Sequence, residues 1–273
     1  MRFCLAVGLL VVSAAPAASQ AKAGDSATIS VESSIDLEIQ VRDGSGENTR
    51  LLSLVRRETF EQEVLAATEG LVSSVRIKVA SSTLQKSGTD VLLEDKPTAL
   101  QGQTYTSTRG AGGWVAKDAT GGAAPAGGAS LGAWNDAGRL LPKTGLAANG
   151  QWDVDAAQVV ALIAPAGVKE ATGKLSCTCQ SLEGNMATVI FSGSVTGRGR
   201  DDAQVTLAIK TGRLEYDLSK GRPTMLSISG SFESILSIED VYRKPGVDSL
   251  EERRKIGEIA IRSRKLEAVF MFK

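Results

Sequence analysis

Two cysteines separated by a single residue are the first residues whose spacing could support chemistry. Cys177 and Cys179 lie in a segment where apolar and polar residues alternate, as is typical of a β-strand. Residues i and i+2 of a strand share a face with Cα atoms about 6.5–7 Å apart, at or beyond the upper edge of disulfide geometry. A disulfide would need a bulge, and a metal site would need further carboxylate ligands. We expect both thiols to be small buried core side chains.

The absence of histidine narrows the chemistry further. No histidine occurs among the 273 residues, and histidine is the usual general base near neutral pH and the commonest metal ligand. Its absence excludes Ser-His-Asp hydrolases, Cys-His proteases and histidine-ligated zinc or iron sites. We therefore expect neither a metal nor another cofactor, and we assign no catalytic residue.

Carboxylates could still perform acid–base catalysis without histidine. The candidates are Glu58, Glu61 and Glu63 in one segment and Asp201 and Asp202 in another. A carboxylate-dependent hydrolase of the periplasm is therefore the alternative function. The same residues also fit simpler roles, because the glutamates can lie on a solvated strand face opposite Arg76 and Lys78. The two aspartates fit the tip of a charged hairpin.

Alternation of apolar and polar residues is the main structural signal in the chain. A strand with one buried face shows this period of two, because successive side chains point to opposite faces. The pattern predicts strands within residues 28–42, 56–67, 71–84, 101–117, 174–232 and 259–272. Residues 51–58 also fit a helix, but we favour a long hairpin. The fold class is mainly β (α+β), with a large curved antiparallel sheet or half-open barrel.

Two details near the C-terminus make the prediction more specific. The charged run Glu251–Lys255 is predicted to be a solvated loop or helical turn. The apolar residues of the final strand change phase near Ser263, which indicates a bulge.

Two short helices are predicted near residues 131–164. Apolar residues at helical spacing, including Trp134, precede Pro142, and a second helical run ends at Pro165. These helices are expected to pack over one end or one face of the sheet.

The second helix begins beside two aspartates. Asp153 and Asp155 could hold calcium, but no loop with further oxygen ligands surrounds them, so helix capping explains them better. Trp152 directly precedes this cap and is placed to fix the helix on the sheet. Trp134, Trp152, Cys177 and Cys179 are the residues to which we assign structural roles.

The N-terminus has the features of a secretory signal peptide. Residues 1–20 contain a basic start, an apolar core and small residues that predict cleavage near residues 17–21. We expect a periplasmic or extracellular protein. Residues 21–273 are predicted to form a single β-rich domain with a flexible Gly/Ala/Pro loop at 119–130. No segment of the mature chain has the roughly 20 apolar residues of a transmembrane helix.

Composition excludes some partners. Basic and acidic residues number 31 each, so no overall field attracts nucleic acid or an anionic membrane. Aromatic residues are 4% of the chain, which argues against a base-stacking surface. We expect no nucleic-acid partner.

Several short segments carry a resemblance. They are residues 100–105 (Leu-Gln-Gly-Gln-Thr-Tyr), 140–142 (Leu-Leu-Pro), 151–154 (Gln-Trp-Asp-Val) and 217–223 (Asp-Leu-Ser-Lys-Gly-Arg-Pro). Their order resembles a diffuse group of secreted bacterial β-rich proteins of unknown function. The resemblance implies a fold type and no activity. In shape alone, a curved sheet closed by short helices is similar to periplasmic lipoprotein carriers, whose apolar inner face holds acyl chains.

These observations favour a non-enzymatic exported protein. Binding of a hydrophobic small molecule or an envelope protein, or a structural role in the envelope, fits the predicted sheet and the missing catalytic groups. Whether the inner face is filled by its own side chains or encloses an apolar cavity decides between these roles.

Overall fold

The fold is described from a computed structural model of the chain. The structure describes residues 21–43, 46–68, 71–89, 91–110, 113–125, 131–143, 145–163, 168–199, 202–243 and 251–273. The predicted signal peptide, residues 1–20, lies outside the described residues, as does part of the predicted loop at 119–130.

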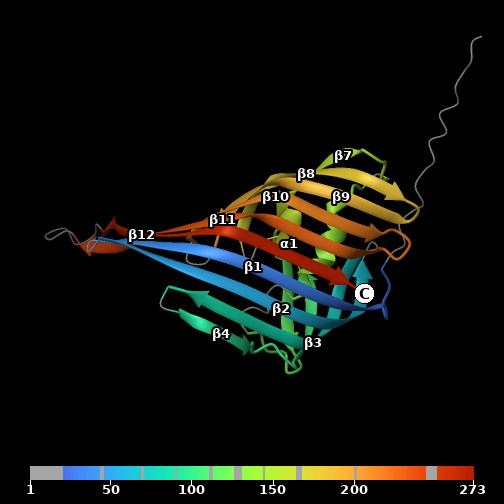
Figure 1. The fold of residues 1–273 in the computed structure, drawn as a ribbon, viewed down its shortest axis with the longest axis horizontal. Helices are drawn as coiled ribbons and strands as arrows, with labels where there is room; N and C mark the ends of the chain where they lie inside the picture. The colour runs from blue at the N-terminus through green and yellow to red at the C-terminus, as the bar shows by residue number, and fades with distance from the viewer. Residues whose placement is uncertain are drawn as a thin grey trace, which may run out of the picture.

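The described residues form one open antiparallel sheet of 12 strands. The strands are β1 (Ser26–Asp43), β2 (Gly46–Thr68), β3 (Leu71–Gly88), β4 (Val91–Pro97), β5 (Thr104–Gly110), β6 (Gly113–Asp118), β7 (Gln151–Asp155), β8 (Lys169–Glu183), β9 (Met186–Arg198), β10 (Gln204–Asp217), β11 (Arg222–Arg243) and β12 (Glu251–Phe272). Their order is β6-β5-β3-β2-β1-β12-β11-β10-β9-β8-β7, and β4 pairs with β3 (Figure 1). The sheet does not close, and the predicted fold class is confirmed.

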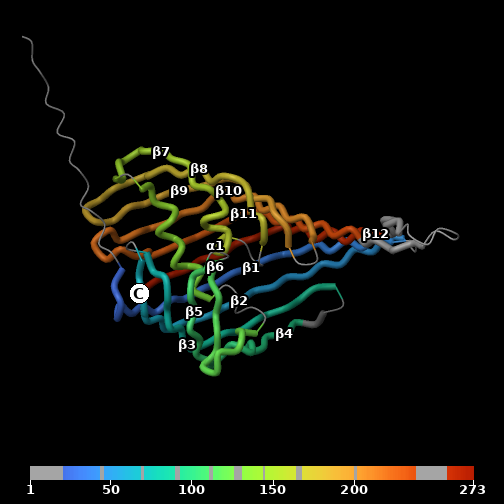
Figure 2. The backbone as a smooth tube through the Cα atoms, turned by 180° about the vertical axis from the view of Figure 1, so that it is seen from behind, coloured from blue at the N-terminus to red at the C-terminus, as the bar shows by residue number. Residues whose placement is uncertain are grey.

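Short helical segments cover one face of the sheet, which we call the inner face. Within the described residues these are η1 (Ala133–Leu140), η2 (Ala156–Gln158) and α1 (Val160–Ile163). Figure 2 shows green segments of the chain, including α1, in front of the sheet. η1 contacts β3 and β11, and η2 contacts β8. The predicted helices near 131–164 are therefore present as short 3₁₀ and α segments.

The start of η2 has the predicted cap. The Asp155 carboxylate accepts a 2.9 Å hydrogen bond from the Ala157 backbone N–H. Such a bond satisfies an amide that has no partner within the helix.

The core lies between the inner face and the helical segments. Its largest fully buried side chains include Phe60 of β2, Phe191 of β9 and Leu140 of η1. Burial alternates along the strands, as in β10, where Val205, Leu207 and Ile209 are buried. The two-residue period seen in the sequence therefore reflects one buried and one solvated face.

The final strand confirms one prediction and corrects another. Asp36 of β1 pairs with Lys265, but Leu37 pairs with Ser263, so Arg264 is the extra residue of a bulge. The charged run Glu251–Lys255, predicted as a loop or helical turn, belongs to β12. It forms a strand because its backbone pairs with the end of β11, a long-range contact that the local charge pattern does not reveal.

Candidate ligand-binding cavity

An apolar cavity of about 680 Å³ lies between the inner face and the helical segments. Its walls come from β1, β2, β3, β4, β11 and β12 on the sheet side and from η1 and α1 on the other. The lining is mainly aliphatic and aromatic, and includes Ile35, Leu54, Phe60, Trp134, Leu162, Ile163, Leu266 and Phe270. Sites for small molecules typically have walls of this composition.

The pairing of β1 with β12 explains why the sheet leaves space here. Ile35 lies opposite Leu266, and Val31 lies opposite Phe270. Between these two apolar pairs, Ser33 lies opposite Ala268. All six side chains line the cavity. The small central pair leaves a hollow in the inner face between two larger pairs.

A hydrogen-bonded aromatic layer closes one end of the cavity. The rings of Phe60 and Trp134 stack with their centroids 4.9 Å apart. The Trp134 indole N–H donates to Gln62 Oε1 at 2.7 Å. The amides of Gln62 and Asn135 bond to each other, with both N···O distances at 3.0 Å. Because Trp134 and Asn135 belong to η1, these contacts fix the helical segment on β2.

A second set of contacts fixes the same helical segment. The buried Asp136 carboxylate accepts hydrogen bonds from Arg109 Nε at 2.7 Å and from Arg139 Nε at 3.0 Å. Arg109 lies on β5, so the ion pair joins η1 to β5. Contacts to β2 and to β5 therefore hold η1 in place over the cavity.

A partly buried ion pair lies on the cavity wall formed by β2. Arg56 and Glu58 form a 2.7 Å salt bridge, and the Ser82 hydroxyl donates to Glu58 Oε1 at 2.8 Å. Burial raises the pKa of the Glu58 carboxyl above its usual value, because removal from water disfavours the charged form. The Arg56 charge and the Ser82 hydrogen bond oppose this shift without cancelling it.

The remaining charged residues of the cavity lie near its rim. Glu94 pairs with Lys96, and Glu267 pairs with Lys265 at 2.9 Å. Lys86, half-buried on β3, lines the cavity and forms no salt bridge within the part of the chain that the structure describes. Glu94, opposite Lys86 in the pairing of β3 with β4, is hydrogen-bonded to Lys96, and Lys86 acts on it only through its charge.

The structure separates the candidate carboxylates. Glu61 and Glu63 lie on the outer face and pair with Lys78 at 2.9 Å and Arg76 at 2.6 Å, as predicted. For Glu58 the expectation of a solvated face is wrong, because its even position places it on the inner face with Phe60. Asp202 is exposed, and Asp201 lies outside the described residues.

The residues assigned structural roles lie within or against the core. Cys177 and Cys179 are buried free thiols, and burial raises the pKa of Cys177 to about 12. Trp134 is buried against Phe60. The Trp152 indole N–H donates to the Leu140 carbonyl at 2.9 Å, which ties β7 to the end of η1.

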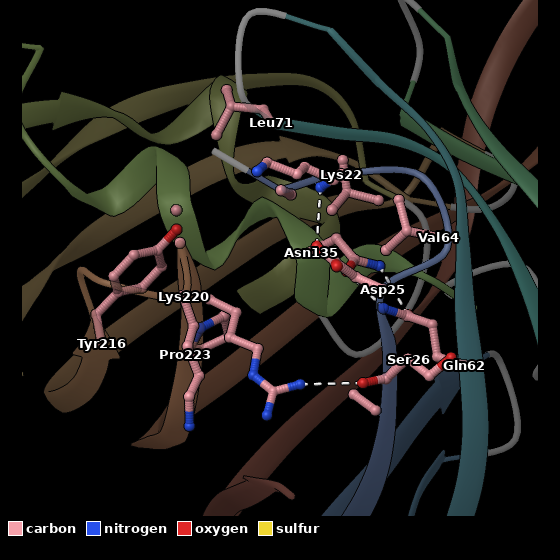
Figure 3. Close-up of a pocket in the computed structure, with 16 residues that line it drawn as sticks. Lys22, Asp25, Ser26, Gln62, Val64, Leu71, Asn135, Tyr216, Lys220 and Pro223 are labelled. Carbon is pink, nitrogen blue, oxygen red and sulfur yellow. Dashed lines mark hydrogen bonds between the residues drawn. The ribbon is translucent and has the colours of Figure 1, made fainter. Parts of the chain in front are cut away.

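A smaller pocket of about 350 Å³ lies beyond the Gln62–Asn135 pair (Figure 3). Lys22, Asp25, Tyr216 and Arg222 are among the residues that line it. Gln62 and Asn135 line this pocket, whereas their neighbours Phe60 and Trp134 line the apolar cavity. The hydrogen-bonded layer therefore separates two spaces of different polarity.

Sequence reasoning did not identify Arg56, Lys86 or the residues of the smaller pocket. Arg56 and Glu58 could have been recognised, because they share the even positions of Phe60 on an otherwise apolar face. Tyr216 and Arg222 gave no such signal, since their neighbours in the pocket come from distant parts of the chain.

Two further observations concern the described residues as a whole. No group of Asp, Glu or Cys side chains there is arranged to hold a metal ion. None of the helices in those residues has the length and apolarity needed to cross a membrane.

Comparisons with known proteins add little. No protein-family model matches the chain, and none of the curated proteins matches it. Among solved structures, the chain is similar to a domain from Vibrio parahaemolyticus that is described as an outer membrane lipoprotein-sorting protein domain. The two share 7% identity over 86% of this chain and 84% of that one, with a TM-score of 0.14. A likeness at that score supports no conclusion about function.

Proposed function

We propose that this protein binds an elongated apolar molecule, of the size of an acyl chain, in the cavity of the inner face. The observation that carries the proposal is the cavity itself, about 680 Å³ with mainly apolar walls. Volumes of about 300–1,000 Å³ with a few placed polar groups are usual for small-molecule sites. The polar groups here are those of the rim, with Lys86 among them.

The free energy of such binding is adequate. Each buried methylene contributes about 0.8 kcal/mol, so roughly ten methylenes contribute about 8 kcal/mol before the loss of translational and rotational freedom is subtracted. The expected dissociation constant is micromolar or weaker, because about −8.2 kcal/mol corresponds to 1 μM. A carrier that must also release its ligand fits this range.

The proposal also includes export of the protein, an envelope partner and structural roles for four residues. The leader pattern of residues 1–20 supports export to the periplasm or beyond, and an envelope protein is the expected partner for delivery or receipt of the ligand. We further propose that Trp134, Trp152, Cys177 and Cys179 serve packing, since each is wholly or partly buried and none lies beside a candidate reactive group.

Ligand capture tests the proposal. The purified protein is incubated with a bacterial lipid extract, re-isolated and analysed by native mass spectrometry, and a fluorescent acyl probe is titrated in parallel. The proposal predicts one-to-one adducts of acyl-containing molecules and a saturable probe signal that fatty acids displace. A folded protein that retains no lipid and gives no saturable signal would refute it.

A further inference from the structure

We propose that the smaller pocket, lined by Tyr216, Lys22 and Arg222, is a binding site for a small oxyanion, either phosphate or a phosphate-bearing headgroup. This site is distinct from the apolar cavity, because the Gln62–Asn135 layer lies between the two.

The first observation is the hydroxyl of Tyr216. This residue is 6% exposed, and its hydroxyl makes no hydrogen bond with any other described residue. Figure 3 shows the side chain directed into the pocket from the β10 side. Burial raises the pKa of Tyr216 to about 12, so the phenol is neutral near physiological pH and its O–H can donate a hydrogen bond to a ligand. The hydroxyl opens onto the pocket, where a bound ligand can accept its hydrogen bond.

The second observation is the excess of positive charge. Among the described residues that line the pocket, Lys22, Lys220 and Arg222 are cationic and Asp25 alone is anionic. Lys220 is held near Asp217 at 3.6 Å, and the Asp25 carboxylate accepts a 2.8 Å hydrogen bond from the Lys22 backbone N–H. Neither the Lys22 ammonium nor the Arg222 guanidinium forms a salt bridge with a described residue.

The third observation is the orientation of Arg222. One of its terminal nitrogens donates to the Ser26 carbonyl at 3.1 Å, and this bond ties the guanidinium to the start of β1, beside the pocket. A guanidinium carries five N–H donors in a planar fork, so most remain available after this bond. Oxyanions such as phosphate and carboxylate match that fork.

The shape of the pocket limits the ligand. Gly138 lies on its wall, and a Cβ atom at that position would come within 3.3 Å of the Tyr216 hydroxyl and 3.2 Å of Leu71. Because Gly138 has no side chain, η1 leaves the Tyr216 hydroxyl open to the pocket. A volume of about 350 Å³ holds a phosphate or a small phosphorylated headgroup, and phosphate presents acceptor oxygens to several donors at once.

Calorimetric titration of the purified protein with inorganic phosphate tests the inference. Binding is expected in the micromolar-to-millimolar range. Tyr216→Phe, which removes one hydroxyl, is expected to weaken binding about tenfold, and Arg222→Gln at least as much. The matched controls are Tyr105→Phe, a buried tyrosine outside the pocket, and Arg213→Gln, which pairs with Glu215 elsewhere. Both controls should bind as the unaltered protein does.

Parallel titrations distinguish the source of the anion. Glycerol phosphate and vesicles of phosphatidic acid are compared with inorganic phosphate, and vesicles of phosphatidylcholine, whose phosphodiester charge is balanced by choline, serve as the zwitterionic reference. Binding of vesicles alone, lost in Tyr216→Phe and Arg222→Gln, assigns the site to a lipid headgroup. If no phosphate-bearing probe binds the folded protein, or if both variants bind like the controls, the inference is wrong.

Discussion

The indole N–H of Trp134 donates a 2.7 Å hydrogen bond to Gln62 Oε1, across 72 residues of sequence. This contact joins η1 to β2 at the boundary between the apolar cavity and the smaller, cationic pocket. On one side Trp134 stacks on Phe60. On the other, Gln62 and Asn135 present their amides to the smaller pocket. The interior is therefore divided by one buried polar layer.

Gln62→Ala tests the importance of this layer for stability. The substitution leaves the Trp134 N–H and the Asn135 amide without their shared acceptor in a buried position. We expect the free energy of unfolding to fall by about 1–3 kcal/mol, measured by urea denaturation. Gln103→Ala, at an exposed position, is the control and should change stability little. Equal stability of both variants would show that the layer is not held by these bonds.

The sheet could be predicted from the sequence because the alternation of apolar and polar residues along each strand shows which side chains are buried. Ile29, Leu175 and Leu214 are fully buried at the positions where the two-residue period placed them. The bulge beside Ser263 was predictable for the same reason. Strand order was not predictable, because the pairing of β1 with β12 joins opposite ends of the chain.

The candidate sites depended on contacts that no local pattern encodes. The cavity lies over the point where Ser33 meets Ala268 across the first and last strands. The smaller pocket combines Lys22, Gln62, Asn135 and Arg222 from four distant segments. Glu58 was misassigned because its neighbours Glu61 and Glu63 are both solvated, and the charged run obscured its inward parity.

Ala268→Phe should block the apolar cavity. A phenyl ring at this small position of the inner face would occupy space that the proposed ligand needs. We expect the affinity for an acyl probe to fall at least tenfold, which corresponds to about 1.4 kcal/mol. Val269→Phe places the same ring one residue away on the outer face, where Val269 is 39% exposed. Binding that survives in Ala268→Phe as well as in Val269→Phe would place the ligand elsewhere.

Lys86 should give the cavity a preference for anionic amphiphiles. Displacement of the probe by dodecanoate and by dodecanol measures this preference. Lys86→Gln is expected to lower the affinity for dodecanoate by about two- to fivefold and to leave dodecanol unaffected, as for a partly exposed ion pair. Lys78→Gln on the outer face is the control. Equal loss of both ligands would mean that Lys86 shapes the wall without recognising charge.

Glu58 should make stability depend on pH in a defined direction. Its folded pKa is raised, so the folded protein binds this proton more tightly than the unfolded chain does. The resulting stabilisation is fully present below the ordinary pKa of 4.5 and is lost as the pH rises through the folded value. The free energy of unfolding of the unaltered protein, minus that of Glu58→Gln, should therefore decrease as the pH rises.

Urea denaturation at a series of pH values measures this difference. Glu61→Gln, which removes an exposed carboxylate of the same strand, is the control for the loss of one negative charge. Parallel stability curves for the unaltered protein and Glu58→Gln would contradict the assigned effect of burial.

Crystals grown with a bromine-labelled fatty acid would show whether an acyl chain binds inside the sheet. An anomalous bromine peak is expected between the inner face and the helical segments, beside Ile35, Phe60 and Leu266. A bromine peak on the outer face, or crystals from saturating ligand with no bromine in that cavity, would contradict the proposed binding.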